Sequence, residues 1–380
     1  MSDWQSRRAR VEPLEDIPLD PDLVRALEAA HGDRFDGEAT PVDLYTPTFK
    51  TYQTSEIRSC GKNAWPAVSV TGSHCKLQCD HCKGQLLEPM IPATTPGELW
   101  QVVQGIVADG GRGMLLTGGS NHRNEVEYGP FYDTIRRIKD HFPDFRIALH
   151  TALVDDDTAR CMEQAGVDTA MMDVIGAQET ITRVYHLRRS VEDFEATLES
   201  LVKTQMKVVP HIVMGLHYGR FLGEWEALRM IRRHPPDAVV LVVVMPFYAP
   251  ERKPFATPGA GEVGRYFLEA RRTLADTRLL LGCARPAGEV KGAMDAYAVM
   301  AGLDGIAHPA DGIVELATRL GRRARVIPAC CSMTLGEAGM PQGTEADLEI
   351  DLEAVIADER ARRRGDGVAP GGIPVVVAEG

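Results

Sequence analysis

Residues 67–84 read AVSVTGSHCKLQCDHCKG, a short apolar run followed at once by three cysteines. The run Ala67–Val70 is short and rich in β-branched residues, which predicts a buried strand. Cys75, Cys79 and Cys82 follow it with the spacing Cys-x3-Cys-x2-Cys. Three thiolates this close together can hold three irons of a cubane and leave the fourth iron open to a chelating ligand. The stretch therefore predicts an iron–sulfur site at the carboxyl end of a strand.

A structural zinc site is the alternative for this stretch, because His74 and His81 flank the cysteines and could join them as ligands. Structural zinc usually takes two ligand pairs from separated segments of a chain. The ligands here all lie on one compact turn, so we favour the iron–sulfur cluster.

The same pattern of strands continues from residue 66 to residue 310. Short β-branched runs alternate there with amphipathic stretches, which is typical of repeated βα units. Seven further runs predict strands: Gly113–Thr117, Arg146–His150, Thr169–Val174, Val208–Met214, Ala238–Met245, Leu279–Cys283 and Gly305–His308. The segment spans about 245 residues, close to the roughly 250 of a (β/α)8 barrel. We predict an α/β fold with a TIM-type barrel, full or partial, and leave open whether the last two strands close it.

Two extensions flank the predicted barrel. Residues 1–65 contain one predicted helix, Pro21–Ala30, and residues 311–380 contain a cysteine-bearing loop and a predicted helix near Thr344–Arg364. Within the barrel, sequence signals indicate where some of the helices begin and end. Thr95-Pro96-Gly97-Glu98 predicts a capping box at a helix start, and Gly166 and Gly302 predict helix ends.

Composition describes an ordinary soluble protein. Of the 380 residues, 44% are hydrophobic and 25% are charged, and no stretch reads as a signal peptide or a membrane span. We therefore expect a cytoplasmic protein, in which eight cysteines indicate metal or redox chemistry better than disulfides. The formal net charge of −12 argues against a nucleic-acid partner, which would require a basic face.

Several residues at strand ends should face the same mouth of the barrel as the cysteine loop. The second strand ends in Gly118-Gly119-Ser120, where missing side chains let a ligand approach the backbone. His150 ends the third strand, Asp173 lies near the end of the fourth, and Gly215 follows the fifth. Each could instead be an ordinary turn, packing or hydrogen-bonding residue.

The other five cysteines divide into two kinds. Cys161 lies in a helical stretch and is best explained as an incidental or buried helix residue. The others lie on loops or at a strand end: Cys60, Cys283, Cys330 and Cys331. Loop cysteines without a local partner are unusual in a cytoplasmic protein unless something joins them at a distance. We predict a second iron–sulfur cluster held by Cys60, Cys283 and one or both of Cys330 and Cys331; the alternative is a set of unliganded thiols.

The Cys-x3-Cys-x2-Cys loop resembles that of the radical S-adenosylmethionine (SAM) superfamily. The resemblance implies that SAM binds the open iron and is cleaved reductively to a 5′-deoxyadenosyl radical that abstracts hydrogen. It also implies that Gly118, Gly119 and Ser120 receive the amino group of SAM, with His150 a further candidate for cofactor binding. His81 stands where the superfamily usually has an aromatic residue against the cofactor, and Gly215 closes a stretch similar to an Ile-x-Gly element near the adenine.

Within that superfamily the stretch from Leu44 to Ser332 is most similar to the biotin-synthase-related proteins, and among them to the two-component lipoyl synthases. The similarity includes Gly282-Cys283-Ala284-Arg285-Pro286 and Cys330-Cys331-Ser332. It implies a transferase that inserts sulfur from an auxiliary cluster into an octanoyl chain on a lipoyl-domain carrier. A sister radical SAM subunit and a reductant such as ferredoxin or flavodoxin are the implied partners.

The sequence departs from that family after the sixth strand. A Pro…Gly-Thr-Pro element is usual there, whereas this chain has Met245-Pro246-Phe247 and, further on, Phe255-Ala256-Thr257-Pro258. Substrate contacts therefore do not transfer at this point. Two other hypotheses stay open: a radical SAM enzyme without sulfur insertion, and a non-enzymatic carrier of an iron–sulfur cluster or zinc.

Overall fold

The structure is a computed structural model and describes residues 17–32, 40–47, 54, 56–57, 65–245, 255–333 and 344–345. Cys60 and the predicted helix beyond Glu345 lie outside these residues. Thr344 and Glu345, placed at the start of that predicted helix, form a short strand instead. All described residues belong to one unit, Met1–Ala346.

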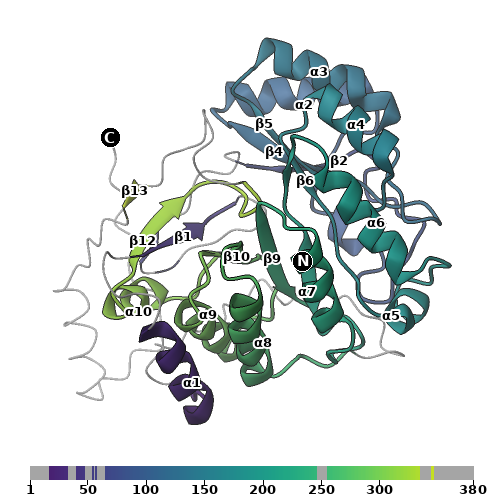
Figure 1. Cartoon of the computed structure of the whole chain (residues 1–380). Helices are drawn as coiled ribbons and strands as arrows, with labels where there is room; N and C mark the ends of the chain where they lie inside the picture. The colour runs from purple at the N-terminus through teal and green to yellow at the C-terminus, as the bar shows by residue number, and fades with distance from the viewer. Residues whose placement is uncertain are drawn as a thin grey trace, which may run out of the picture. The chain divides into compact units, whose positions relative to one another are not determined.

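Strands and helices alternate along most of the chain (Figure 1). The strands are β1 (Pro41–Tyr45), β2 (Ala67–Ser69), β3 (Ile91–Pro92), β4 (Gly113–Thr117), β5 (Arg146–His150), β6 (Thr169–Met171), β7 (Lys207–Val208), β8 (His211–Met214), β9 (Ala238–Val243), β10 (Arg278–Leu281), β11 (Gly305–Ala307), β12 (Arg323–Ile327) and β13 (Thr344–Glu345). The α-helices are α1 (Pro21–Gly32), α2 (Pro96–Ala108), α3 (Tyr132–His141), α4 (Asp156–Ala165), α5 (Gln178–Arg183), α6 (Val191–Val202), α7 (Glu224–Arg233), α8 (Ala260–Thr273), α9 (Glu289–Met300) and α10 (Ile313–Arg319). All eight strands predicted within the barrel are present, with the fifth divided into β7 and β8.

The strands form two sheets that meet at this division. One sheet has the order β3-β2-β4-β5-β6-β7, and the other has the order β13-β12-β1-β11-β10-β9-β8. Among the strands that the structure describes, all ladders are parallel except that between β12 and β13. A bridge between Asp173 and His211 continues the pairing of the β6 segment onto β8. The two sheets therefore form one curved surface. The division between β7 and β8 falls at Pro210, which has no N–H to donate to a neighbouring strand.

Two strands of this surface come from outside the predicted barrel boundaries. Strand β1 lies between β11 and β12, with Leu44 opposite both Ile306 and Val326. The boundaries 66–310 therefore omit β1 and β12. Strand β1 escapes a hydrophobicity-based prediction because its buried inner face includes Asp43, whose carboxylate is paired with Arg278 and Arg325.

The barrel is partial. The predicted seventh and eighth strands, β10 and β11, do join the sheet, but β11 then pairs with β1. Strand β2 pairs with β3 and β4, and in the described part of the chain no ladder links it to β12 or β13. The prediction of an α/β, TIM-type barrel is thus confirmed in its partial form.

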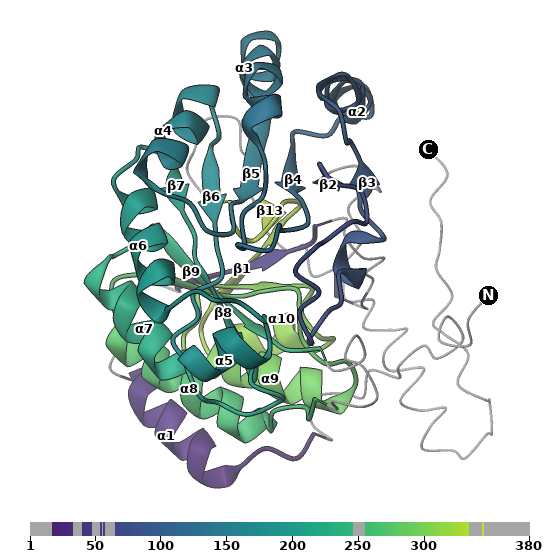
Figure 2. The same ribbon diagram turned by 90° about the vertical axis from the view of Figure 1, so that its right-hand side faces the viewer.

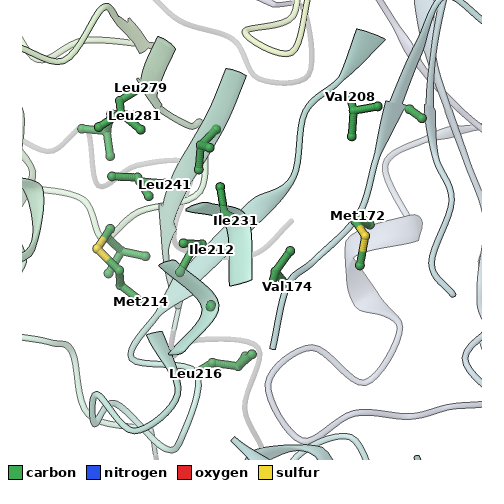
Figure 3. Close-up of a cluster of buried hydrophobic side chains, with 14 of the residues drawn as sticks. Met172, Val174, Val208, Ile212, Met214, Leu216, Ile231, Leu241, Leu279 and Leu281 are labelled. Atoms are coloured by element: carbon green, nitrogen blue, oxygen red, sulfur yellow. The ribbon is translucent and has the colours of Figure 1, made fainter. Parts of the chain in front are cut away.

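Helices cover the outer face of the curved sheet (Figure 2). Helix α2 begins as predicted, with Thr95 and Glu98 forming a capping box and Pro96 in the first turn, and it buries Leu99, Val103 and Ile106 against the strands. The outer core between strands and helices is mainly aliphatic, and Figure 3 shows a part of it with side chains of β8, β9, β10 and α7. None of the helices in the described part of the chain combines the length and apolar character needed to cross a bilayer.

Candidate active site at the carboxyl ends of the strands

The cysteine loop leaves β2 and packs against the end of β4. The Gly119 N–H donates to Thr71 Oγ1 at 2.6 Å, and the Lys76 N–H donates to the Ser120 carbonyl at 2.9 Å. A Cβ on Gly119 would lie 1.9 Å from the carbonyl oxygen of His74. The space left by the missing side chain is therefore filled by the cysteine loop itself, where the sequence had suggested an approaching ligand. Gly118 is similarly confined, by Val126 and Val70.

The three cysteines of the loop form one electrostatic group. Cys75 Sγ lies 3.8 Å from the Ser120 carbonyl, which faces the loop from β4. The Cys79 thiol and the Cys82 sulfur share a hydrogen bond that lowers the pKa of Cys82 and raises that of Cys79, and Cys75 raises the latter further. The thiolate is the form in which a cysteine binds a metal.

The donor set of the cysteine loop suits a cluster. Among the described residues, no three His, Cys, Asp or Glu side chains stand where they could hold one metal ion. A cubane does not require that convergence, because each of its protein ligands binds a different iron. The donor set of three neighbouring thiols therefore fits the implied [4Fe–4S] group on Cys75, Cys79 and Cys82.

His81 faces the mouth just before the third cysteine. Its ring centroid lies 5.3 Å from that of Tyr185, and its Nδ1 is buried without a hydrogen-bond partner in the described residues. Burial lowers the pKa of His81, but the Cys82 thiolate and two nearby carboxylates raise it above its ordinary value overall.

A polar layer crosses the mouth beside His81. Three neighbouring strands contribute to it. His150 ends β5, Asp173 follows β6, and His211 begins β8. His150 Nε2 lies 3.7 Å from Asp173 Oδ1, and the ring centroids of His150 and His211 are 5.9 Å apart. The Tyr185 hydroxyl donates to Asp173 Oδ2 at 3.5 Å. The structure thus brings the predicted pair His150 and Asp173 together and adds His211 and Tyr185.

Charge stabilises this layer. Burial raises the pKa of Asp173, but the hydrogen bond and charge of His150, with two further histidines, lower it overall to about 2. Burial lowers the pKa of His211 to about 4, and His150 adds to that shift. An ionised Asp173 therefore faces a neutral His211. The sequence signal for His211 was its place in β8, where it alternates with buried Ile212 and so faces inward.

Gly215 occupies a backbone turn that has no space for a side chain. Its φ is +75°, and a Cβ there would lie 2.3 Å from Pro258 Cγ. Its N–H donates to the buried Glu224 at 2.8 Å. These contacts account for a glycine at this position, whatever binds nearby.

A second group of thiols lies at the other half of the mouth. Cys330 and Cys331 share a hydrogen bond that lowers the pKa of Cys330 and raises that of Cys331, and the latter also interacts electrostatically with Cys283. All three border an inner apolar group that includes Val242, Leu280, Ala307 and Ala329. Three of the four cysteines predicted to share a second site therefore border one apolar group, and Cys60 lies outside the described residues. Cys161 is exposed on α4.

Arg285 holds the turn that carries Cys283, a role that the sequence did not reveal. Its guanidinium donates to the Gly282 carbonyl at 2.5 Å and to the His308 carbonyl at 2.9 Å. It also forms an ion pair with Asp295 at 2.7 Å, and neither side chain is exposed. One buried cation thus fixes the ends of β10 and β11.

Strained backbone is concentrated at this mouth. Among the described residues, seven that are not glycine have a positive φ: Gln78, Lys83, Asn124, Ala152, His186, Tyr218 and His308. Each lies in a connection that leaves the carboxyl end of a strand. Such conformations persist only where their surroundings determine them, and they are common at functional sites.

No protein-family model matches the sequence, and no curated protein is significantly similar to it. The fold, by contrast, resembles that of solved structures.

The particular structures are distant in sequence. HydG, a maturase of the [FeFe]-hydrogenase, matches with a TM-score of 0.56 and 12% identity over 82% of this chain and 70% of that chain. Methylornithine synthase (PylB) matches with a TM-score of 0.47 and 12% identity over 90% and 86% of the two chains. HemN from Escherichia coli, a coproporphyrinogen III oxidase and radical SAM enzyme, matches with a TM-score of 0.40 and 12% identity over 68% and 62%. At 12% identity the similarity to HydG establishes the fold alone, so an activity has to be argued from the site.

Proposed function

We propose that this protein is a radical SAM enzyme that inserts sulfur into an unactivated C–H bond. The observation that carries the proposal is that six cysteines, in two groups of three, follow the carboxyl ends of strands in one partial barrel. One group is the loop after β2, and the other comes from the ends of β10 and β12.

The first group provides the radical chemistry. Cys75, Cys79 and Cys82 would each hold one iron of a [4Fe–4S] cluster and leave the fourth iron for the amino and carboxylate groups of SAM. When bound, this cluster supplies the electron that cleaves SAM to methionine and a 5′-deoxyadenosyl radical. Tyr185 and the half-buried His81 would border the cofactor, and Gly119 with Ser120 would keep the loop seated on β4.

The second group would hold the sulfur source, an auxiliary iron–sulfur cluster. Cys283, Cys330 and Cys331 are its described candidates, and the apolar residues beneath them suit an aliphatic substrate. The 5′-deoxyadenosyl radical would take a hydrogen atom from a substrate C–H bond and leave as 5′-deoxyadenosine. A sulfide of the second site would then bond to the carbon radical while its own bonds to iron break, and the electron released would reduce an iron of that site. Each C–S bond then requires one adenosyl cleavage.

The substrate and partners follow from the resemblance to the two-component lipoyl synthases. We propose an octanoyl chain on a lipoyl-domain carrier as the substrate, with electrons from a ferredoxin or flavodoxin. A sister radical SAM subunit would share the two sulfur insertions.

The deciding experiment uses anaerobically reconstituted protein with SAM, dithionite and an octanoyl-carrier peptide deuterated on the chain. We expect about eight irons per chain, as two four-iron clusters require, deuterium in 5′-deoxyadenosine and a thiolated peptide. Deuterated 5′-deoxyadenosine without a thiolated peptide would support a radical SAM enzyme of another reaction type. Failure to form 5′-deoxyadenosine would exclude the enzymatic proposal and leave a carrier of a cluster or zinc.

A further inference from the structure

Asp80 is a buried carboxylate inside the cysteine loop that neither the motif nor the proposed chemistry requires. It lies between Cys79 and His81, and 2% of its surface is exposed. Its own N–H donates to the Val184 carbonyl at 2.8 Å. A charge so well buried needs partners to remain stable.

Three side chains from three different connections supply those partners. Lys83 Nζ donates to Asp80 Oδ1 at 2.7 Å from within the cysteine loop. His186 Nε2 contacts the same oxygen at 3.0 Å from the segment after α5, and the Tyr218 hydroxyl donates to Oδ2 at 2.9 Å from the turn after β8. The carboxylate therefore ties the loop after β2 to the connections that follow β6 and β8.

All three partners adopt a strained backbone conformation. The φ angles of Lys83, His186 and Tyr218 are +49°, +57° and +56°, a region that side chains other than glycine rarely adopt. They are three of the seven such residues among those described. Because strain of this kind persists only where the surroundings determine it, its convergence on one carboxylate indicates that the contact is built into the site.

We propose that Asp80 is a positioning residue that fixes the Cys79–Cys82 half of the cysteine loop, and with it His81, against the far side of the mouth. It touches neither an iron nor SAM and acts through its chain neighbours, as an outer partner orients a metal ligand. The inference rests on the proposed cluster site. If Asp80 has this role, the position of the cluster ligands depends on the connections that follow β6 and β8.

The test compares two Asp→Asn variants, in each of which a carboxylate held by several side chains loses its charge. Asp80→Asn keeps the shape of the side chain and removes its charge. Asp168→Asn is the control, since Asp168 accepts from Lys139 at 2.9 Å and Arg146 at 2.8 Å at the opposite ends of the strands. Tyr218→Phe is a milder variant that removes one donor and keeps the carboxylate.

In the reconstituted protein, Asp80→Asn should keep its iron but change the electron paramagnetic resonance signal of the reduced cluster and its response to SAM. The KM for SAM should rise about tenfold, in the range that loss of an outer partner of a metal ligand causes, with a smaller change in kcat. Tyr218→Phe should shift both readouts in the same direction, and Asp168→Asn should shift neither. In the metal-free protein, hydrogen exchange at the amides of Cys82 and Lys83, which donate to the Cys79 carbonyl, should accelerate in Asp80→Asn alone.

A lower melting temperature in both Asp→Asn variants, with unchanged exchange at Cys82 and Lys83 and an unchanged cluster signal, would show a purely structural role and overturn the inference. If the wild type bound no cluster while the exchange difference persisted, the positioning of the loop would stand and the proposed function would fail.

Discussion

The two halves of the barrel mouth are built from different chemistry. The half formed by β2 to β8 is polar: Asp80 accepts from three side chains, and Asp173 lies among two histidines and a tyrosine. In the half formed by β9 to β12, the second thiol group borders apolar residues that include Val242, Leu280, Ala307 and Ala329. The main charge pair of this half, Arg285 and Asp295, is fully buried.

The difference indicates that one half positions the cysteine loop and the other half contacts the substrate. Hydrogen bonds orient groups at defined angles, so the polar half can hold a loop whose three cysteines must meet a cluster in one arrangement. The second thiols border apolar residues, which suits an aliphatic chain that offers nothing to hydrogen-bond. Five measurements would break or sharpen this comparison.

The largest effect should come from the cysteine loop. Replacing Cys75, Cys79 or Cys82 by alanine should abolish SAM cleavage, because no other thiol of the loop can complete the attachment. The measurement is 5′-deoxyadenosine formed by the dithionite-reduced protein. Cys161→Ala, at an exposed helix position, is the control and should retain activity. Full activity in any of the three loop variants would contradict the assignment.

Cys283→Ala should separate the two halves. We expect 5′-deoxyadenosine formation and the loop cluster to remain while thiolated product disappears, because only the second thiol group loses a ligand. Mass spectrometry of the carrier peptide, beside iron analysis, measures both. An alanine variant that inserts sulfur as well as the wild type would remove Cys283 from the auxiliary site.

Asp295→Asn should test how strongly the apolar half depends on its buried ion pair. Leaving Arg285 buried without its partner should lower the free energy of unfolding by about 3–5 kcal/mol, the usual effect of breaking such a pair. Asp133→Asn breaks an exposed pair with Arg136 at 2.7 Å and should cost less than about 1 kcal/mol. Urea unfolding of the apo-proteins measures both, and equal losses would mean that burial of the Arg285 pair adds nothing.

The same pair should contribute to acid stability. Burial raises the pKa of Asp295, but Arg285 and Lys291 lower it overall. A carboxyl whose pKa is lower in the folded state stabilises the fold above its unfolded pKa of about 3.9. That contribution is lost as the pH falls through the folded pKa. The unfolding free energies of wild type and Asp295→Asn should therefore differ at neutral pH and converge below about pH 4; a constant difference would argue against this linkage.

The smallest effect should come from His81→Phe. His81 packs beside Tyr185 and is not needed for the three-point attachment, so iron content and SAM cleavage should both be retained. If His81 were a metal ligand, phenylalanine would remove the metal together with the activity.

Much of this fold was predictable because its signals are local. Each predicted barrel strand is a short apolar run, and the start of α2 follows from Thr95, Pro96 and Glu98 within a single turn. The cysteine loop is also local, since its three ligands lie within eight residues directly after β2. Spacing along the chain carries such information without any knowledge of the tertiary structure.

Only the tertiary structure decided the rest. Strand β1 joins β11 and β12 across more than half of the chain, and its inward Asp43 is buried only because two arginines from other strands reach it. The partners of Asp80 are likewise distant, with Tyr218 138 positions away. Whether a polar residue is a surface group or a buried anchor depends on what the fold brings to it, because its desolvation must be offset by partners that no local pattern encodes.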